Sequence, residues 1–77
     1  MMDTEHSVHR LVRREAVLHF NDGETSMRGF LTDFFYSPDA ILVAKPTLLV
    51  ADQSPEELGG DVLVYENQIK FIQILGG

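Results

Sequence analysis

The sequence predicts one mainly β domain, in which a short N-terminal helix precedes a five-stranded, strongly bent antiparallel barrel. Three observations carry this prediction. Apolar residues come in short runs, and the clearest of these alternate with polar residues, a period typical of strands. Turn-forming residues separate the runs at short intervals. A chain of 77 residues has room for one domain, so residues 1–77 are assigned to a single domain.

Residues 3–12 have the pattern of a short helix. Val8, Leu11 and Val12 form one apolar stripe at the i, i+3, i+4 spacing of a helix face. A helix of this length persists in water only when it packs against other elements. We therefore expect it to lie on the barrel, which is predicted to span residues 14–75.

The first two strands are predicted at residues 14–20 and 25–36. In the first strand, the more strongly apolar residues occupy every second position. The intervening Asn21-Asp22-Gly23 favours a tight turn, so the second strand is expected to return antiparallel to the first. The second strand is long for so small a domain, and Gly29 in its interior is the expected site of a bend.

The middle of the chain predicts a reversal followed by more barrel wall. Ser37-Pro38-Asp39 has turn composition, and two apolar runs follow at residues 41–44 and 48–51. Pro46 stands between these runs and marks an edge or a bulge, because proline has no backbone N–H to give to a sheet.

The last third of the chain predicts a loop and two strands. Residues 52–61 are polar and acidic and are expected to form an exposed loop, with room for one helical turn after Pro55. The strands at residues 62–65 and 69–75 should meet at a sharp corner. Five of the seven residues in the last strand are apolar, which exceeds the need of one buried face. A partner covering the second face would explain the excess.

Composition excludes several classes of protein. Twelve acidic and six basic residues give a net charge of −6, which opposes non-specific binding to phosphate backbones. The apolar runs are far shorter than the roughly 18 residues of a membrane span. With no cysteine and an acidic start, the sequence predicts a cytoplasmic protein. We find no catalytic constellation and expect no enzyme activity, no cofactor and no small-molecule substrate.

Two sequence motifs match a known family. Gly29, Leu31, Phe34 and Leu42 fit the pattern Gly-x-Leu-x-x-Phe-Asp-x-x-apolar-Asn-x-x-Leu. Val64 and Ile69 fit the two ends of apolar-Arg-Gly-x-Asn-Ile/Val, and Asn67 lies between them, one residue before the place of its Asn. With the order of helix, strands and turns, these matches resemble the Sm-like family, which includes the Sm, LSm and bacterial Hfq proteins. The resemblance covers most of the chain and implies the Sm-like fold, an SH3-like barrel.

The resemblance also implies self-assembly. In the family, the fourth strand of one subunit pairs with the last strand of its neighbour, which implies a homo-oligomeric ring of roughly five to seven subunits. The residues that this pairing would place at the subunit interface are Val62, Leu63, Val64, Ile69, Phe71, Ile72 and Ile74.

Single-stranded RNA bound at the inner rim of the ring is the function that the resemblance implies. The corresponding residues are Phe35, Tyr36, Asp39, Tyr65 and Asn67. The chain departs from the family pattern here, because Phe35, Asp39, Tyr65 and Glu66 replace its Asp, Asn, Arg and Gly. An ionised Asp only accepts hydrogen bonds, and Tyr lacks the cation of Arg. Aromatic rings could instead stack on bases.

Other interpretations remain open at this level. A ring that binds no nucleic acid and serves as a protein-assembly scaffold is the first alternative. A cyclic-dinucleotide-binding domain of the PilZ type is a remote one, suggested by Arg10-x-x-x-Arg14 and Glu24-x-Ser26-x-x-Gly29. His6 and His9 have i, i+3 spacing but lack further ligands, so we expect solvated histidines and no metal site. His19, between apolar neighbours, is expected to be structural.

Overall fold

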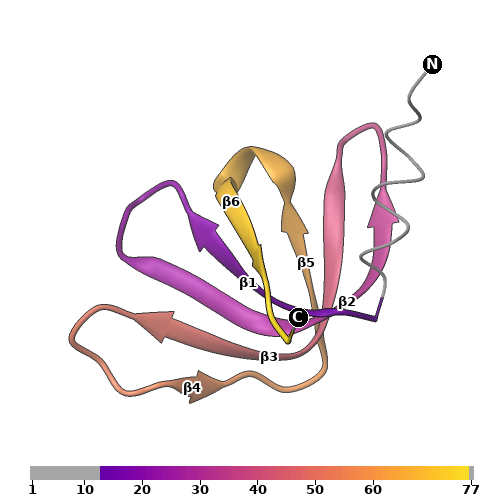
Figure 1. Ribbon diagram of the computed structural model, residues 1–77. Helices are drawn as coiled ribbons and strands as arrows, with labels where there is room; N and C mark the ends of the chain where they lie inside the picture. Colours follow the sequence, from indigo (N-terminus) through magenta and orange to yellow (C-terminus); the bar gives the residue numbers. More distant parts are fainter. Residues whose placement is uncertain (1–12, 77) are drawn as a thin grey trace.

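The computed structural model describes residues 13–76 and contains one strongly bent antiparallel sheet (Figure 1). The strands are β1 (Glu15–Phe20), β2 (Thr25–Phe35), β3 (Ala40–Val50), β4 (Glu56–Glu57), β5 (Asp61–Tyr65) and β6 (Ile69–Ile74). A single 3₁₀ turn, η1 (Glu66–Gln68), joins β5 to β6. The helix predicted at residues 3–12 lies outside the described residues. No helix in the described part of the chain is long and apolar enough to cross a membrane.

The long strand β3 connects the two parts of the sheet. The strand order is β4-β3-β2-β1-β6, and β5 also pairs with β3. Residues Ala40 to Ala44 of β3 pair with β5, whereas Thr47 and Leu48 pair with β4. The two ends of β3 therefore belong to different parts of the barrel, as the divergence of β4 and β5 in Figure 1 shows.

The predicted bend at Gly29 is confirmed, and its cause is close packing of β2 against β3. A Cβ on Gly29 would lie 2.5 Å from Val43 Cγ1 and 2.9 Å from the Ala44 carbonyl oxygen. Opposite Gly29, the ladder between β2 and β3 is irregular, and Lys45 has a positive φ of 51°. The predicted bulge near Pro46 thus lies directly across from the glycine, and the two features bend the strand pair together.

The turn between β1 and β2 has the predicted composition and a specific internal bonding. Asp22 Oδ1 accepts the backbone N–H groups of Glu24 and Thr25 at 2.9 and 2.8 Å, and Asp22 Oδ2 accepts the Thr25 hydroxyl at 2.6 Å. Gly23 has a φ of 76°, a conformation that glycine adopts without strain. These contacts determine where β2 begins.

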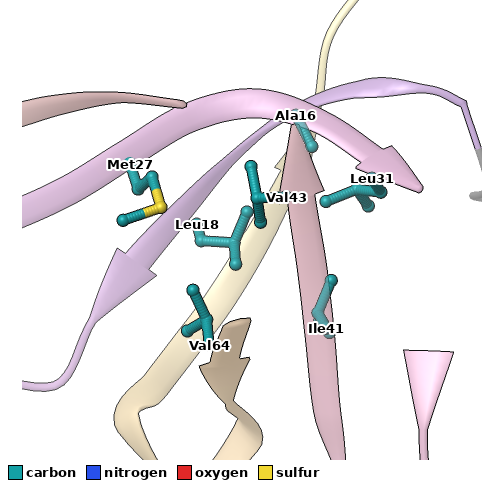
Figure 2. Packing of buried hydrophobic residues seen from close by; sticks show 7 residues of the cluster. All are labelled: Ala16, Leu18, Met27, Leu31, Ile41, Val43 and Val64. Atoms are coloured by element: carbon teal, nitrogen blue, oxygen red, sulfur yellow. The ribbon is translucent and has the colours of Figure 1, made fainter. Parts of the chain in front are cut away.

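The core lies on the inner face of the sheet, where side chains of β1, β2, β3 and β5 meet. Figure 2 shows its buried residues: Ala16, Leu18, Met27, Leu31, Ile41, Val43 and Val64. Leu18, Leu31 and Val43 are fully buried. None of the buried residues in the described chain is polar or charged, so the side chains of the core stabilise the fold through apolar burial.

Four expectations for the second half of the chain and for the strand count are corrected. Residues 52–61 are not wholly loop, because Glu56 and Glu57 form the short strand β4 on the second half of β3. No helical turn follows Pro55. The expected five strands are therefore six, and the two apolar runs of the middle segment form one continuous strand. The reason is that β3, once bent, offers a free edge with which even two acidic residues can pair through their backbones.

Candidate functional site

The strands β5 and β6 each leave one side of their backbone unpaired. Within residues 13–76, β5 pairs only with β3, and β6 pairs only with β1. The turn η1 joins the two strands, but they pair with different strands and do not form a ladder with each other. We call the unpaired sides of β5 and β6 the open edges. Such edges present N–H and C=O groups in a row and are templates for a further strand.

The backbone direction at the open edge of β6 follows from its ladder with β1. Leu75 N–H donates to the Glu15 carbonyl at 2.9 Å, and Gln73 is the register partner of Val17. In an antiparallel pair, alternate residues direct their backbone groups to the partner strand. Residues Ile72 and Ile74 therefore direct their N–H and C=O groups to the open side.

Side chains on β5 and β6 are only partly covered. Leu63 is 43% exposed and Phe71 is 52% exposed. The predicted interface residues Val62, Ile69, Ile72 and Ile74 are half-buried, whereas Val64 is a core residue. The side chain of Val64 is thus committed to the core. Its backbone groups face β3, because the Glu66 N–H donates to the Asp39 carbonyl and alternate residues of β5 bond to the same strand. On β5, Leu63 and Tyr65 direct their backbone groups to the open side.

An apolar hollow of about 380 Å³ opens beside β5. It lies between that strand and the β1–β2 turn, and Phe20, Met27 and Val62 are among the residues that line it. Gln68 of η1 borders it too. The sequence did not identify Phe20 and Met27 as site residues, because the alternation of apolar and polar residues along their strands indicates only that they face inward.

The residues predicted for RNA binding gather at one end of the molecule. The β2–β3 loop and η1 meet there, and the Glu66 N–H donates to the Asp39 carbonyl at 2.9 Å. Asp39, Tyr65 and Asn67 border one hollow of about 250 Å³. Phe35, Tyr36 and Asp39 border a second hollow of about 110 Å³. We call this end of the molecule the rim.

The rim is aromatic and acidic. Phe35, Tyr36 and Tyr65 are each between 44% and 49% exposed. Asp39 and Glu66 lie among them, and among residues 13–76 no Lys or Arg borders either hollow. Rings of this exposure could stack on flat ligands, whereas the two carboxylates repel phosphate groups.

The position of Asn67 depends on a contact that the sequence did not reveal. Asn21 Nδ2–H donates to the Asn67 carbonyl at 2.7 Å, and Asn21 N–H donates to the Gln68 carbonyl at 3.0 Å. The β1–β2 turn therefore holds η1 in place. In the sequence, Asn21 indicated only a turn, because its side-chain partner lies 46 residues further along the chain.

His19 has a structural environment on the outer side of the sheet. Gln73 Oε1 can only accept, so His19 Nε2–H donates to it, at 3.1 Å, and the Ser26 hydroxyl donates to Nδ1 at 3.2 Å. The imidazole stacks on Phe71, with ring centroids 4.3 Å apart. These contacts tie β1, β2 and β6 together, as expected for a structural histidine.

Two residues of the motif that suggested a PilZ domain have structural roles in this fold. Ser26 bonds to His19, and Gly29 permits the close packing of β2 on β3. Arg10, His6 and His9 lie outside the described residues. Among residues 13–76, no group of three or more metal-ligating side chains is found.

Comparisons with known proteins identify the fold. No protein-family model and no curated protein sequence matches the chain. Among solved structures, the P. aerophilum SmAP1 heptamer has a TM-score of 0.81 at 17% identity, with 100% of both chains covered. The Pyrococcus abyssii Sm protein in complex with a uridine heptamer has a TM-score of 0.77 at 12% identity, covering 96% of this chain and 100% of that one.

A third similar structure comes from a different kind of assembly. A chain of the NatC complex bound to CoA has a TM-score of 0.75 at 13% identity, covering 97% of this chain and 87% of that one. All three identities are low, so the likeness concerns the path of the backbone. The bent sheet, the corner at η1 and the agreement with archaeal Sm proteins lead to one conclusion: this chain has the Sm-like fold.

Proposed function

We propose that this protein is a ring-forming Sm-like subunit whose copies join through their open edges, β5 of one subunit to β6 of the next. The observation that carries the proposal is the pair of unpaired strand edges, found on different strands of one bent sheet. Because the two edges differ, the contact is head-to-tail, and head-to-tail contacts close into rings when the rotation per subunit allows it. Its activity is binding and assembly rather than catalysis.

The energetics favour assembly over an isolated subunit. A chain of this size buries only about 60% of the surface that its unfolded form exposes. Strand pairing adds backbone hydrogen bonds worth about 0.5–1.5 kcal/mol each. Filling the hollow beside β5, which Phe20, Met27 and Val62 help to line, adds apolar burial, at about 25 cal/mol per Å². The heptameric state of the P. aerophilum protein supports a ring, because its backbone matches this chain over its full length.

The test is the molar mass of the full chain and of one edge variant, measured by light scattering after size exclusion. We expect a ring for the natural chain. Ile74→Pro removes a backbone N–H that faces the open side, so it should lower the mass toward that of a single subunit. Ile74→Val keeps the donor and is the matched control, expected to remain a ring. A natural chain that runs as a compact monomer would refute the proposal.

Single-stranded RNA binding at the rim is a second candidate function. It is favoured by the gathering of Phe35, Tyr36 and Tyr65 around two hollows. The Pyrococcus abyssii protein, solved with a uridine heptamer, supports it. Asp39 and Glu66 weigh against it, because they place negative charge where the phosphates would pass.

Fluorescence anisotropy with labelled oligo-U and oligo-A, at low salt, tests this second function. If bases stack on the rim, Tyr36→Ala and Tyr65→Ala should each weaken binding by about five- to 150-fold, the equivalent of about 1–3 kcal/mol per stacked base. Phe30→Ala, which removes an exposed ring away from the rim, should leave binding unchanged. Absence of any binding would leave the assembly function as the sole proposal.

A further inference from the structure

The strands β2, β3 and β5 have an outer face, opposite the core. Ile41 and Val43 of β3 and Val64 of β5 point into the core. Because successive residues of a strand point to opposite sides, their neighbours in sequence point outward. The register places the outward residues in rows that run across the three strands. We call this surface the outer face.

Large apolar side chains stand on both sides of the outer face. Phe30 and Phe35 belong to β2 and are 42% and 44% exposed, and Leu63 and Tyr65 belong to β5 and are 43% and 47% exposed. These are four of the six exposed large apolar residues in the described chain. Apolar groups gathered in this way mark interaction surfaces more often than scattered ones do.

The centre of the outer face is made of smaller side chains. On β3, between the two flanking strands, the outward residues are Ala40, Leu42 and Ala44; Leu42 and Ala44 are half-buried, whereas Ala40, between Phe35 and Tyr65 in the register, is only 2% exposed. Neighbouring strands lie about 4.8 Å apart, so the flanking columns are about 10 Å apart, which is close to the diameter of a helix. From Ala40 to Ala44 the strand advances about 14 Å, the length of about nine helical residues.

Acidic side chains outnumber basic ones on and around the outer face. Asp33 pairs with Leu42 and Asp61 pairs with Ala44, so both carboxylates lie among the apolar residues. Asp39 and Glu66 stand just beyond the Tyr65 end. Arg28, two residues before Phe30 on the same side of β2, is a basic residue beside this face, and it forms an ion pair with Glu15, with 2.9 Å between Nε and Oε2. Such a surface repels nucleic acid and acidic lipid, and it opposes a second copy of this chain, whose net charge is −6.

We propose that the outer face binds a basic amphipathic helix of a partner protein. An apolar stripe of the helix, at i, i+3, i+4 and i+7, lies over Ala40 to Ala44, between the rings of β2 and the side chains of β5. Lysine or arginine beside the stripe meets Asp33 and Asp61. This binding goes beyond ring assembly, because it uses a face of the sheet and leaves both open edges available.

The probe for the test is a fluorescein-labelled synthetic peptide of about 12 residues, with leucine on one helical stripe and lysine at most other positions. Anisotropy titration of the full chain should show binding. Two peptides serve as controls: one with glutamate in place of lysine, and one with the same composition and a scrambled stripe. Both should bind at least about tenfold more weakly. Equal binding of either control, or no binding of the lysine peptide, overturns the proposal.

Three protein variants locate the binding. Phe30→Ala and Asp61→Lys should each weaken binding of the lysine peptide at least about tenfold. Glu24→Lys makes the same charge change in the β1–β2 turn and should alter affinity less than about twofold. The edge variant Ile74→Pro should bind as the natural chain does, even if no ring forms. Unchanged affinity in Phe30→Ala and Asp61→Lys would place the peptide elsewhere and refute the assignment.

A last variant tests whether another part of the chain occupies the outer face. Leu11→Ser lies in the first twelve residues and should leave peptide affinity unchanged. An increase of about tenfold or more would mean that the chain's own start competes for the surface. The outer face would then have an internal occupant, and the partner helix would be ruled out.

Discussion

Gly29 controls the shape of the sheet through the absence of a side chain. Its hydrogen points at Val43 and at the Ala44 carbonyl, and no Cβ fits between them. The sequence predicted a bend here, because a glycine inside a long strand weakens the strand and often marks a bend or a close backbone approach. It could not predict the partner, because the bulge across from Gly29 arises from the conformation of Lys45.

We expect Gly29→Ala to destabilise the protein by about 1–3 kcal/mol, as over-packing typically does. The new methyl group would lie 2.5 Å from a buried side chain and 2.9 Å from a backbone oxygen. Urea unfolding at one fixed protein concentration measures the effect. Gly59→Ala is the control, because no atom lies within 4 Å of its added Cβ. Equal stability of both variants would contradict this account of the bend.

Asp22 acts at the residue scale through its charge. Hydrogen bonds from the Thr25 hydroxyl and from the backbone N–H groups of Glu24 and Thr25 lower the pKa of the Asp22 carboxyl from 3.8. A lowered pKa in the folded state gives stability that is present above the unfolded value and is lost as the pH falls through the folded one.

Asp22→Ala should therefore destabilise the protein more at about pH 7 than in acid. The difference from the natural chain should shrink as the pH falls below 3.8. Asp22→Asn keeps an acceptor at Oδ1 and should lose less stability than Asp22→Ala. Urea unfolding across the acid range measures both variants. A pH-independent difference would show that the turn does not depend on the ionised carboxylate.

At the scale of elements, the two strands with open edges differ from the rest of the sheet. β1, β2 and β3 have partners on both sides, whereas β5 and β6 have one each within the described chain. The two-residue strand β4 also has one partner, but it is too short to offer a row of backbone groups. If β6 pairs with a neighbouring subunit, the backbone amides on its open side are protected from hydrogen exchange only in the assembly. The amides that face β1 are protected in either state.

Amide hydrogen exchange should separate these two sets. In a dilution series that dissociates the ring, Ile72 and Ile74 should exchange faster as the protein concentration falls. Gln73, on the β1 side, should change much less and is the internal control. Fast exchange of Ile72 and Ile74 at every concentration would mean that the edge of β6 stays open.

Strand positions were predictable where alternation and turn residues coincide. The strands at residues 14–20 and 25–36 were placed within one residue of their observed ends. β4 was missed, because Glu56 and Glu57 carry no strand signal and pair only by virtue of the free edge of β3. The residues predicted for RNA binding border two hollows at one end of the molecule, and their role stays a prediction. Phe20, Met27 and Asn21 were missed, because their partners are distant in the sequence.

At the scale of the whole molecule, net charge opposes assembly. Each subunit carries −6, so a ring gathers like charges at short range. We expect the ring to become more stable as salt rises from about 0.05 M to about 0.5 M, because screening weakens the repulsion. Light scattering on diluted samples measures this. A ring that dissociates as salt rises would instead indicate ion pairs across the subunit contact.

The difference between the two open edges has a consequence for mixtures. A subunit whose β6 is blocked, as in Ile74→Pro, still offers an intact β5 to the natural chain. Its β5 can pair with β6 of one natural subunit, but its own β6 cannot pair with β5 of another. It therefore ends an incomplete ring before the ring can close. A minority of such subunits should therefore break many rings, and the damage should exceed their share of the mixture.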